Sequence, residues 1–158
     1  MTLEFGLLNR EELRQAAELA ARAFSDYEYF TNWFPDDEER AKVEISIIWH
    51  SYKTNFKRVH PLSAKLDGKT SVKKTGPGIW YVSSLSVDPT MQGIGLGTQL
   101  LEYCENYIRE RDGKQVVLVT NSQKNLNFYI KRGYELFDER VFEYNYHKMG
   151  SWSLKKVL

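Results

Sequence analysis

The N-terminal part of the chain places apolar residues at helical spacing. Asn9 and Glu12, three residues apart, form a capping-box pattern, and apolar positions then recur every three or four residues as far as Phe24. This pattern predicts a helix that ends near Phe24. Asp36 and Glu39 repeat the capping pattern just after a proline, and they predict the start of a second helix.

Five other segments have the composition of β-strands. Gln115 to Thr120 is almost wholly β-branched or apolar, which is typical of a central parallel strand covered on both faces. Ile79 to Val87 is apolar and partly aromatic, and an Asp-Pro pair ends it. Tyr134 to Tyr144 and Trp152 to Val157 alternate well enough to predict two closing antiparallel strands, and Thr2 to Leu8 could form a first strand.

Turns and two further helices are predicted around these strands. A long periodic segment after a glycine-rich turn predicts a helix to about Asp112. Ser122 to Arg132 predicts another helix, with Gly133 placed for a left-handed C-cap. Asp67-Gly68 has the form of a two-residue hairpin turn, and Met149 to Ser151 is expected between or beside the closing strands.

Composition narrows the class of protein. A chain of 158 residues has the size of one domain, so residues 1–158 are predicted to form a single domain. With 22 basic and 21 acidic residues the net charge is only +1, which favours neither a nucleic acid nor a membrane surface as partner. Cys104 is the only cysteine and is expected to be a small buried hydrophobe; with no leader or membrane-spanning pattern, the sequence indicates a cytoplasmic protein. The three histidines lack ligand spacing, so no metal site is predicted.

The most informative stretch is Leu85 to Thr98, between a predicted strand and a predicted helix. Gly93, Gly95 and Gly97 stand at alternate positions in it. Without Cβ atoms, glycines let backbone N–H groups turn inward and approach a ligand closely, and the start of the helix adds positive partial charge. That combination predicts a cradle for a diphosphate.

Two other phosphate-binding loops fit the stretch less well. A nucleotide P-loop ends in Gly-Lys-Ser/Thr, whereas Gly97 is followed by Thr98 and Gln99. The dinucleotide fingerprint needs glycine at the position of Thr98 and usually opens a domain near its first strand. A nucleotide-binding domain therefore remains the weakest alternative, and it would bind ATP or NAD.

The stretch resembles the central motif of the GNAT superfamily of N-acetyltransferases, a strand ending in Val-x-Pro followed by Gln/Arg-x-x-Gly-x-Gly/Ala and a helix. Gln92 to Gly97 fits that motif position for position, and Asn125 to Tyr134 resembles the second signature, a tyrosine four residues before a Gly-aromatic pair. The resemblance is clear from Trp80 to Glu135. It implies an α/β fold whose mixed, mostly antiparallel sheet is splayed at a central parallel strand pair and flanked by about four helices.

The resemblance also implies acetyl-CoA as the cofactor. Backbone N–H groups near Leu85 and Val87 would bind the pantetheine arm and the thioester carbonyl, and Asn121 and Asn125 would add side-chain hydrogen bonds. The diphosphate would be held by one continuous loop, namely Gln92, Gly93, Ile94, Gly95, Leu96, Gly97 and Thr98.

Tyr129 matches the family tyrosine beside the coenzyme sulfur, so the resemblance implies a general acid for the departing thiolate. An unperturbed phenol, with a pKa of about 10, is protonated at neutral pH. The alternative is an aromatic side chain packed against the sheet. Replacement by phenylalanine distinguishes these roles.

The base is less well defined, because the motif strand offers serines where some relatives carry a carboxylate. Ser83 is the catalytic candidate, acting through a relayed water, and Ser84 and Ser86 lie on the same segment. Glu28 and His147 are other candidates, each more simply explained as a surface residue. An aromatic cluster between the two N-terminal helices, residues 27–34, is either core or the border of the acceptor site.

The predicted activity is that of an acyltransferase that moves acetyl from acetyl-CoA to a primary amine by direct attack on the thioester. The acceptor is a small-molecule or peptide amine, and a homodimer is left open. The alternative is an acyl-CoA-binding sensor or interaction domain with weak catalysis. Lys69 to Lys74 is short and polar where the family has a strand, so either this member is trimmed or the sequence omits a segment near Val72 to Lys74.

Overall fold

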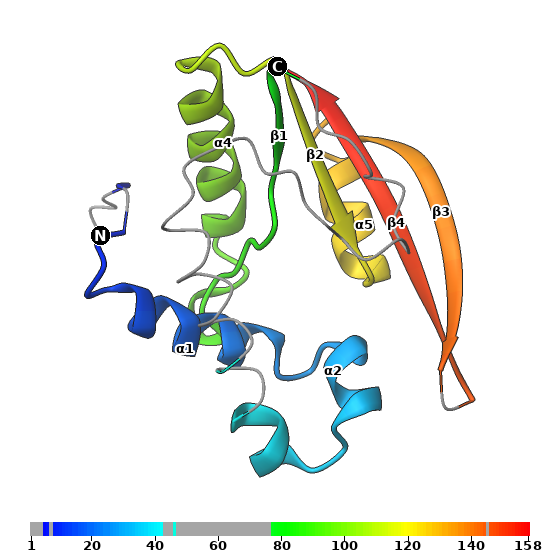
Figure 1. Cartoon of the computed structure of the whole chain (residues 1–158). Coiled ribbons are helices and arrows are strands. Elements are labelled where there is room, and N and C mark those ends of the chain that lie inside the picture. The colour runs from blue at the N-terminus through cyan, green and yellow to red at the C-terminus, as the bar shows by residue number, and fades with distance from the viewer. Residues whose placement is uncertain (1–4, 7, 43–45, 47–76, 145) are drawn as a thin grey trace. The chain divides into compact units, whose positions relative to one another are not determined.

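A computed structural model describes residues 5–6, 8–42, 46, 77–144 and 146–158 (Figure 1). The chain divides into two compact units. One comprises Met1–Val59 with Leu85–Cys104, and the other comprises His60–Ser84 with Glu105–Leu158. The prediction of a single domain stays a prediction.

The first unit begins with helix α1, Leu13–Phe24. The predicted capping box is confirmed, because the N–H of Asn9 donates to Glu12 Oε2 at 2.8 Å and the N–H of Glu12 donates to Asn9 Oδ1 at 3.1 Å. The buried face of the helix contains three alanines, Ala17, Ala20 and Ala21. Phe24 packs against them. Small side chains of high helix propensity let this helix pack closely.

The connection after α1 contains a short helix that its aromatic composition did not reveal, α2, Glu28–Trp33. Residues 37–42 are also helical. The predicted cap is present there, since Asp36 Oδ1 accepts the N–H of Glu39 at 2.8 Å. Arg40 donates to the carbonyl of Phe34 at 2.9 Å, which ties the new helix to the preceding turn. The later part of the predicted second helix lies outside the described residues.

The second unit contains a four-stranded sheet of order β1-β2-β4-β3. Its strands are β1 (Ile79–Tyr81), β2 (Gln115–Thr120), β3 (Glu135–Tyr144) and β4 (His147–Val157). The pair β1–β2 is parallel, and β4 pairs antiparallel with both β2 and β3. The predicted mixed, mostly antiparallel α/β fold is therefore confirmed, and β2 coincides with the predicted central strand.

Two strand predictions were wrong in extent. β1 ends at Tyr81 rather than Val87, because its ladder with β2 closes at the bond from the N–H of Val82 to the carbonyl of Val117, 3.0 Å. An apolar run does not reveal where a partner strand diverges. β4 begins at His147 rather than Trp152, since Tyr144 already pairs with His147, so residues 149–151 lie inside a strand.

Helices α4, Leu96–Arg109, and α5, Gln123–Ile130, follow β1 and β2 along the chain. α4 ends before the predicted Asp112, which itself adopts a positive φ of 57° in the turn that follows. α5 is capped by Ser122, whose hydroxyl accepts the N–H of Asn125. Gly133 has a φ of 81°, as its predicted left-handed position requires.

A buried charged cluster links α4 to the last strand of the second unit. Glu105 is 4% exposed and accepts hydrogen bonds from Lys156 Nζ at 3.0 and 2.7 Å and from the Tyr134 hydroxyl at 3.1 Å. Burying a carboxylate is costly unless it is paired and hydrogen-bonded. The cluster therefore fixes which side of α4 faces Lys156.

Other predictions fall on residues that the structure does not describe or describes in part. The Asp67-Gly68 turn and the segment from Val72 to Lys74 lie outside the described residues. Of the predicted first strand, residues 5, 6 and 8 are described, and none of these three is in a strand.

Candidate functional site

The glycine-rich loop lies between a 3₁₀ turn, Pro89–Met91, and the first turn of α4. Gly93 and Gly95 adopt positive φ angles of 84° and 88°. Residues with side chains rarely adopt such angles, so glycine is needed at both positions for backbone conformation alone. The loop from Gln92 to Gly95 is exposed, and Ile94 is 64% exposed.

The space around these two glycines is open. A Cβ atom added to Gly93 would meet nothing within 4 Å, and one added to Gly95 would meet only Gln99 Nε2 at 3.9 Å. Packing against the protein therefore does not explain the two glycines. The open positions leave room for a ligand to approach the backbone.

Gly97 differs in backbone conformation from the other two glycines of the predicted cradle. It is the second residue of α4 and is not among the residues with positive φ. The N–H groups of Thr98 and Gln99 donate to the carbonyl of Gly95 at 3.1 and 3.2 Å, so Thr98 starts the helical hydrogen bonding. This conformation follows from helix geometry, because the first turn of a helix needs no left-handed residue. Leu96 and Gly97 instead place their N–H groups at the helix start, where anions bind.

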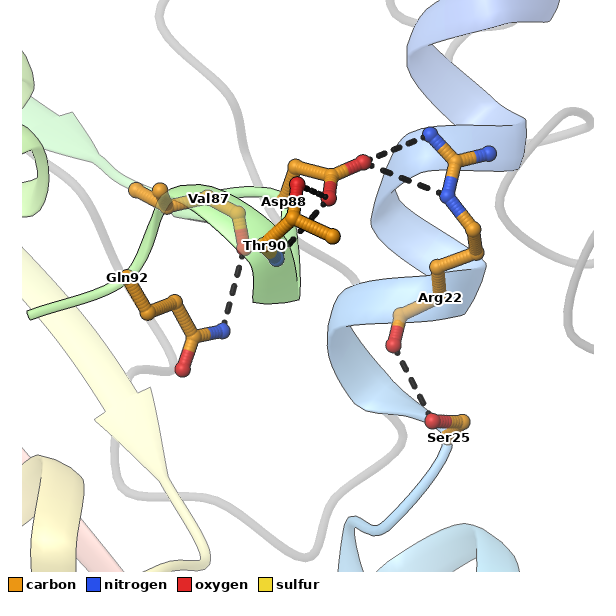
Figure 2. Close-up of polar contacts among 6 residues, drawn as sticks. All are labelled: Arg22, Ser25, Val87, Asp88, Thr90 and Gln92. Atoms are coloured by element: carbon orange, nitrogen blue, oxygen red, sulfur yellow. Dashed lines mark hydrogen bonds and ion pairs between the residues drawn. The ribbon is translucent and has the colours of Figure 1, made fainter.

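Asp88 organises the segment just before this loop (Figure 2). Its Oδ1 accepts the N–H of Thr90 at 3.1 Å and the hydroxyl of Thr90 at 2.7 Å, which caps the 3₁₀ turn. Gln92 Nε2 donates to the carbonyl of Val87 at 3.1 Å, so the first residue of the loop is tied back across the turn. Local hydrogen bonds thus fix the backbone conformation just before the glycine-rich loop.

Arg22 of α1 reaches the same aspartate from 66 residues away in the chain (Figure 2). Its Nη2 and Nε lie 2.8 and 3.2 Å from Asp88 Oδ2, while Ser25 Oγ donates to the Arg22 carbonyl at 3.0 Å. These bonds, first from Arg22 and then from Thr90, lower the pKa of the Asp88 carboxyl to about 2. Sequence analysis did not identify Arg22, because no local pattern marks a contact over that separation.

Leu85 and Val87, the predicted pantetheine-binding positions, are half-buried and lie outside any strand. The three serines of this segment differ from one another. Ser83 is exposed and Ser86 is half-buried, whereas Ser84 has a buried hydroxyl oxygen without a hydrogen-bond partner in the described structure.

In the second unit Tyr129 lies on α5 and is 8% exposed. Its ring packs edge-on against Phe128, with centroids 5.1 Å apart, and against Tyr134 at 5.5 Å. Its carbonyl accepts the N–H of Tyr134 at 3.2 Å. The ring is thus held by its neighbours, which suits either an aligned acid or a core aromatic.

The predicted asparagines occupy the end of β2 and the start of α5. Asn121 Nδ2 donates to the carbonyl of Gly150 at 2.8 Å, which fastens the end of β2 to β4. The N–H of Asn125 donates to Ser122 Oγ at 3.5 Å, and its side chain is half-buried. Asn121 therefore has a structural role whatever ligand it meets.

The remaining candidates give weaker signals. His147 is exposed, Cys104 is half-buried rather than buried, and the Glu28 side chain lies outside what the structure describes. Among the described residues no group of three or more metal-ligating side chains occurs, and no described helix is long and apolar enough to cross a membrane.

Comparison with known families decides the class of the protein. A family model described as an acetyltransferase (GNAT) domain matches residues 50–149. The chain belongs to the GNAT acetyltransferase family. An uncharacterized protein of Bacillus subtilis, YxbD, is 43% identical over 60 residues, which span 37% of this chain and only 36% of that relative.

Solved structures support the GNAT fold over the whole chain. The PaiA N-acetyltransferase of Thermoplasma acidophilum, solved in complex with coenzyme A, aligns over 100% of both chains with a TM-score of 0.66 and 17% identity. A GCN5-related N-acetyltransferase of Rhodopseudomonas palustris covers 96% of this chain and 92% of its own, with a TM-score of 0.61 and 18% identity. At such identities the likeness establishes the fold and leaves the substrate open.

Proposed function

We propose that this GNAT protein transfers the acetyl group of acetyl-CoA to a primary amine of a small molecule or a peptide. The observation that carries the proposal is the pair of glycines at the start of α4. Gly93 and Gly95 adopt positive φ and leave the space beside their backbone open. A diphosphate needs such a surface of accessible N–H groups at a helix start.

The described residues of this loop fit coenzyme A better than a free nucleotide. The exposed turn carries no lysine to meet a terminal phosphate, so its attraction for an anion comes from backbone N–H groups and the helix start. This suits the internal diphosphate of coenzyme A. The PaiA N-acetyltransferase with the same fold was solved with coenzyme A, which supports the assignment.

The chemistry is divided between the coenzyme and the chain. When bound, the thioester supplies an activated acetyl group. The chain's own task is to hold the thioester carbonyl with backbone N–H groups near Leu85 and Val87, to hold the amine, and to donate a proton to the departing sulfur from Tyr129. Packing of the Tyr129 ring between Phe128 and Tyr134 would keep the phenol in one orientation.

Two measurements on the full chain test the function. Calorimetry should show coenzyme A binding more tightly than ATP or NAD. A thiol-release assay with acetyl-CoA over a panel of primary amines should show turnover with at least one of them. Binding without turnover would favour the acyl-CoA sensor instead, and tighter binding of ATP would contradict the proposal.

Replacing Tyr129 by phenylalanine tests the acid. The ring and its packing are retained, while the proton donor is lost, so kcat should fall roughly 10²-fold with the affinity for coenzyme A unchanged. Unchanged turnover would leave Tyr129 as a packed aromatic only. A lowered melting temperature would indicate that the hydroxyl has a structural role.

A further inference from the structure

The hydroxyl of Ser84 is the polar group that the described structure leaves unexplained. Its oxygen is shielded from solvent and makes no hydrogen bond to the described part of the protein. A buried hydroxyl in this state lowers stability, and native structures seldom retain one without a reason such as a catalytic or ligand-binding role.

The position of Ser84 along the chain suggests the reason. The ladder between β1 and β2 closes at the bond from Val82 N–H to the Val117 carbonyl, and Ser84 follows two residues later. Beyond that bond, β2 continues to Thr120 with β4 as its strand partner in the sheet. Ser84 therefore stands just beyond the point at which the parallel pair ends.

We infer that Ser84 is an amine-binding residue whose hydroxyl oxygen accepts a hydrogen bond from the N–H of the attacking primary amine. This assignment rests on the proposed function and names Ser84, not its exposed neighbour Ser83, as the serine that contacts the amine. Solvent already satisfies the Ser83 hydroxyl, so it gains little by contacting a ligand.

The chemistry of the two reactants favours the amine over the coenzyme as the partner of this hydroxyl. Backbone N–H groups of the following residues are donors and suit the carbonyl oxygens of the thioester and pantetheine arm. A serine hydroxyl can also accept, and the incoming amine brings N–H donors. Serine is far too weak an acid or base to take the proton by itself, so its role is to orient the nitrogen.

The test compares three alanine variants of the full chain. In Ser84→Ala, the specificity constant for the amine should fall about tenfold or more, because one oriented hydrogen bond is lost. Dissociation constants for acetyl-CoA should stay unchanged, and the melting temperature should rise, since an unsatisfied buried hydroxyl is removed. Putrescine, a lysine-containing peptide and a peptide with a free α-amine serve as probes.

Ser153→Ala is the matched control, because Ser153 is buried at 2% exposure but is not without a partner. It should lower the melting temperature and leave the amine specificity unchanged. A Ser84 without a role in amine binding would likewise leave the amine specificity unchanged. An activity loss in Ser84→Ala together with a higher melting temperature therefore supports the assignment.

Three results would overturn it. One is full retention of amine specificity in Ser84→Ala, and another is a loss confined to Ser83→Ala. The third is a weakened dissociation constant for acetyl-CoA in Ser84→Ala, which would assign the hydroxyl to the coenzyme. If the wild-type chain releases no thiol with any probe, the proposed function itself fails, and the amine role of Ser84 fails with it.

Discussion

The glycines of the loop before α4 and the glycine after α4 occupy opposite kinds of environment. Around Gly93 and Gly95 an added Cβ would find open space, whereas at Gly113 it would collide with the side chain of Ile108 and come within 2.8 Å of both the Ile108 carbonyl and Trp80 Nε1. Gly113 also donates its N–H to the Ile108 carbonyl at 2.9 Å. One glycine is needed for close packing, and the other two for backbone conformation and an accessible backbone.

Substitutions of glycine in this protein should therefore affect either stability or ligand binding, depending on whether the glycine is enclosed or open. A substitution at the enclosed glycine must be absorbed by the core, while a substitution at an open glycine changes mainly what can approach the loop. The experiments below measure both effects in the same variants.

The largest effect is expected from Gly113→Ala. The new methyl group would push on a backbone carbonyl and on the edge of an indole, and the chain offers little room to relax, so the free energy of unfolding should fall by roughly 3 kcal/mol. Urea denaturation monitored by circular dichroism measures this. The affinity of the remaining folded protein for coenzyme A should be unchanged, and a stability loss below about 0.5 kcal/mol would show that the enclosure is looser than described.

A smaller loss of stability and a larger loss of binding are expected from Gly95→Ala. A φ of 88° is unfavourable for alanine, which costs about 1–2 kcal/mol, while coenzyme A affinity should drop at least tenfold, or about 1.4 kcal/mol. Calorimetry of the variant measures its affinity for coenzyme A, and urea denaturation measures its stability.

Gly6→Ala is the control for Gly95→Ala. An added Cβ at Gly6 also meets nothing within 4 Å, but Gly6 is not among the residues of positive φ. In Gly6→Ala, the affinity for coenzyme A and the free energy of unfolding should both stay within error of the wild-type values. Equal affinities for coenzyme A in Gly95→Ala and in the wild type would contradict the cradle.

The smallest effect is expected from Arg22→Ala, which removes the ion pair to Asp88. Arg22 is exposed, and exposed pairs contribute little to stability, so the affinity for coenzyme A should weaken only about two- to threefold. The pKa of Asp88 should rise from about 2 towards the ordinary 3.8, because the strongest hydrogen bond to the carboxylate is lost while those of Thr90 remain.

Carbon-13 NMR of the Asp88 carboxyl measures that shift directly. Because the folded pKa is lowered, the stabilising contribution of the carboxylate is fully present above pH 3.8 and is lost as the pH falls through about 2. Binding near neutral pH should therefore not depend on this group. An unchanged titration midpoint in Arg22→Ala would contradict the contact drawn in Figure 2.

Local patterns predicted those features that depend on a few neighbouring residues. The capping box of Asn9 and Glu12, the limits of β2 and the left-handed Gly133 all follow from residues within one or two turns of each other. The glycine loop and its place before a helix were predicted for the same reason. Its proposed ligand came from the family resemblance.

Features that depend on distant parts of the chain were not predictable in this way. The end of β1 depends on where β2 diverges, and the Arg22 contact joins residues far apart in the sequence. The difference between Ser83 and Ser84 is one of burial, which adjacent serines in a short apolar run do not encode. The equal spacing of the three glycines did not show that the loop becomes helix before Gly97, whose place in the cradle stays a prediction.

The buried carboxylate of Glu105 also has a consequence for assembly of the sheet. Lys156 meets it only when β4 is aligned with β2 as observed, with Lys156 opposite Val116. A slip of β4 by one residue would turn Lys156 to the opposite face of the sheet and leave the carboxylate with only the more distant Arg109, whose Nη2 lies 3.7 Å from Glu105 Oε2, as an ion-pair partner. Losing the shorter of these two ion pairs disfavours the misaligned sheet, so a single glutamate helps to select the register of the final strand.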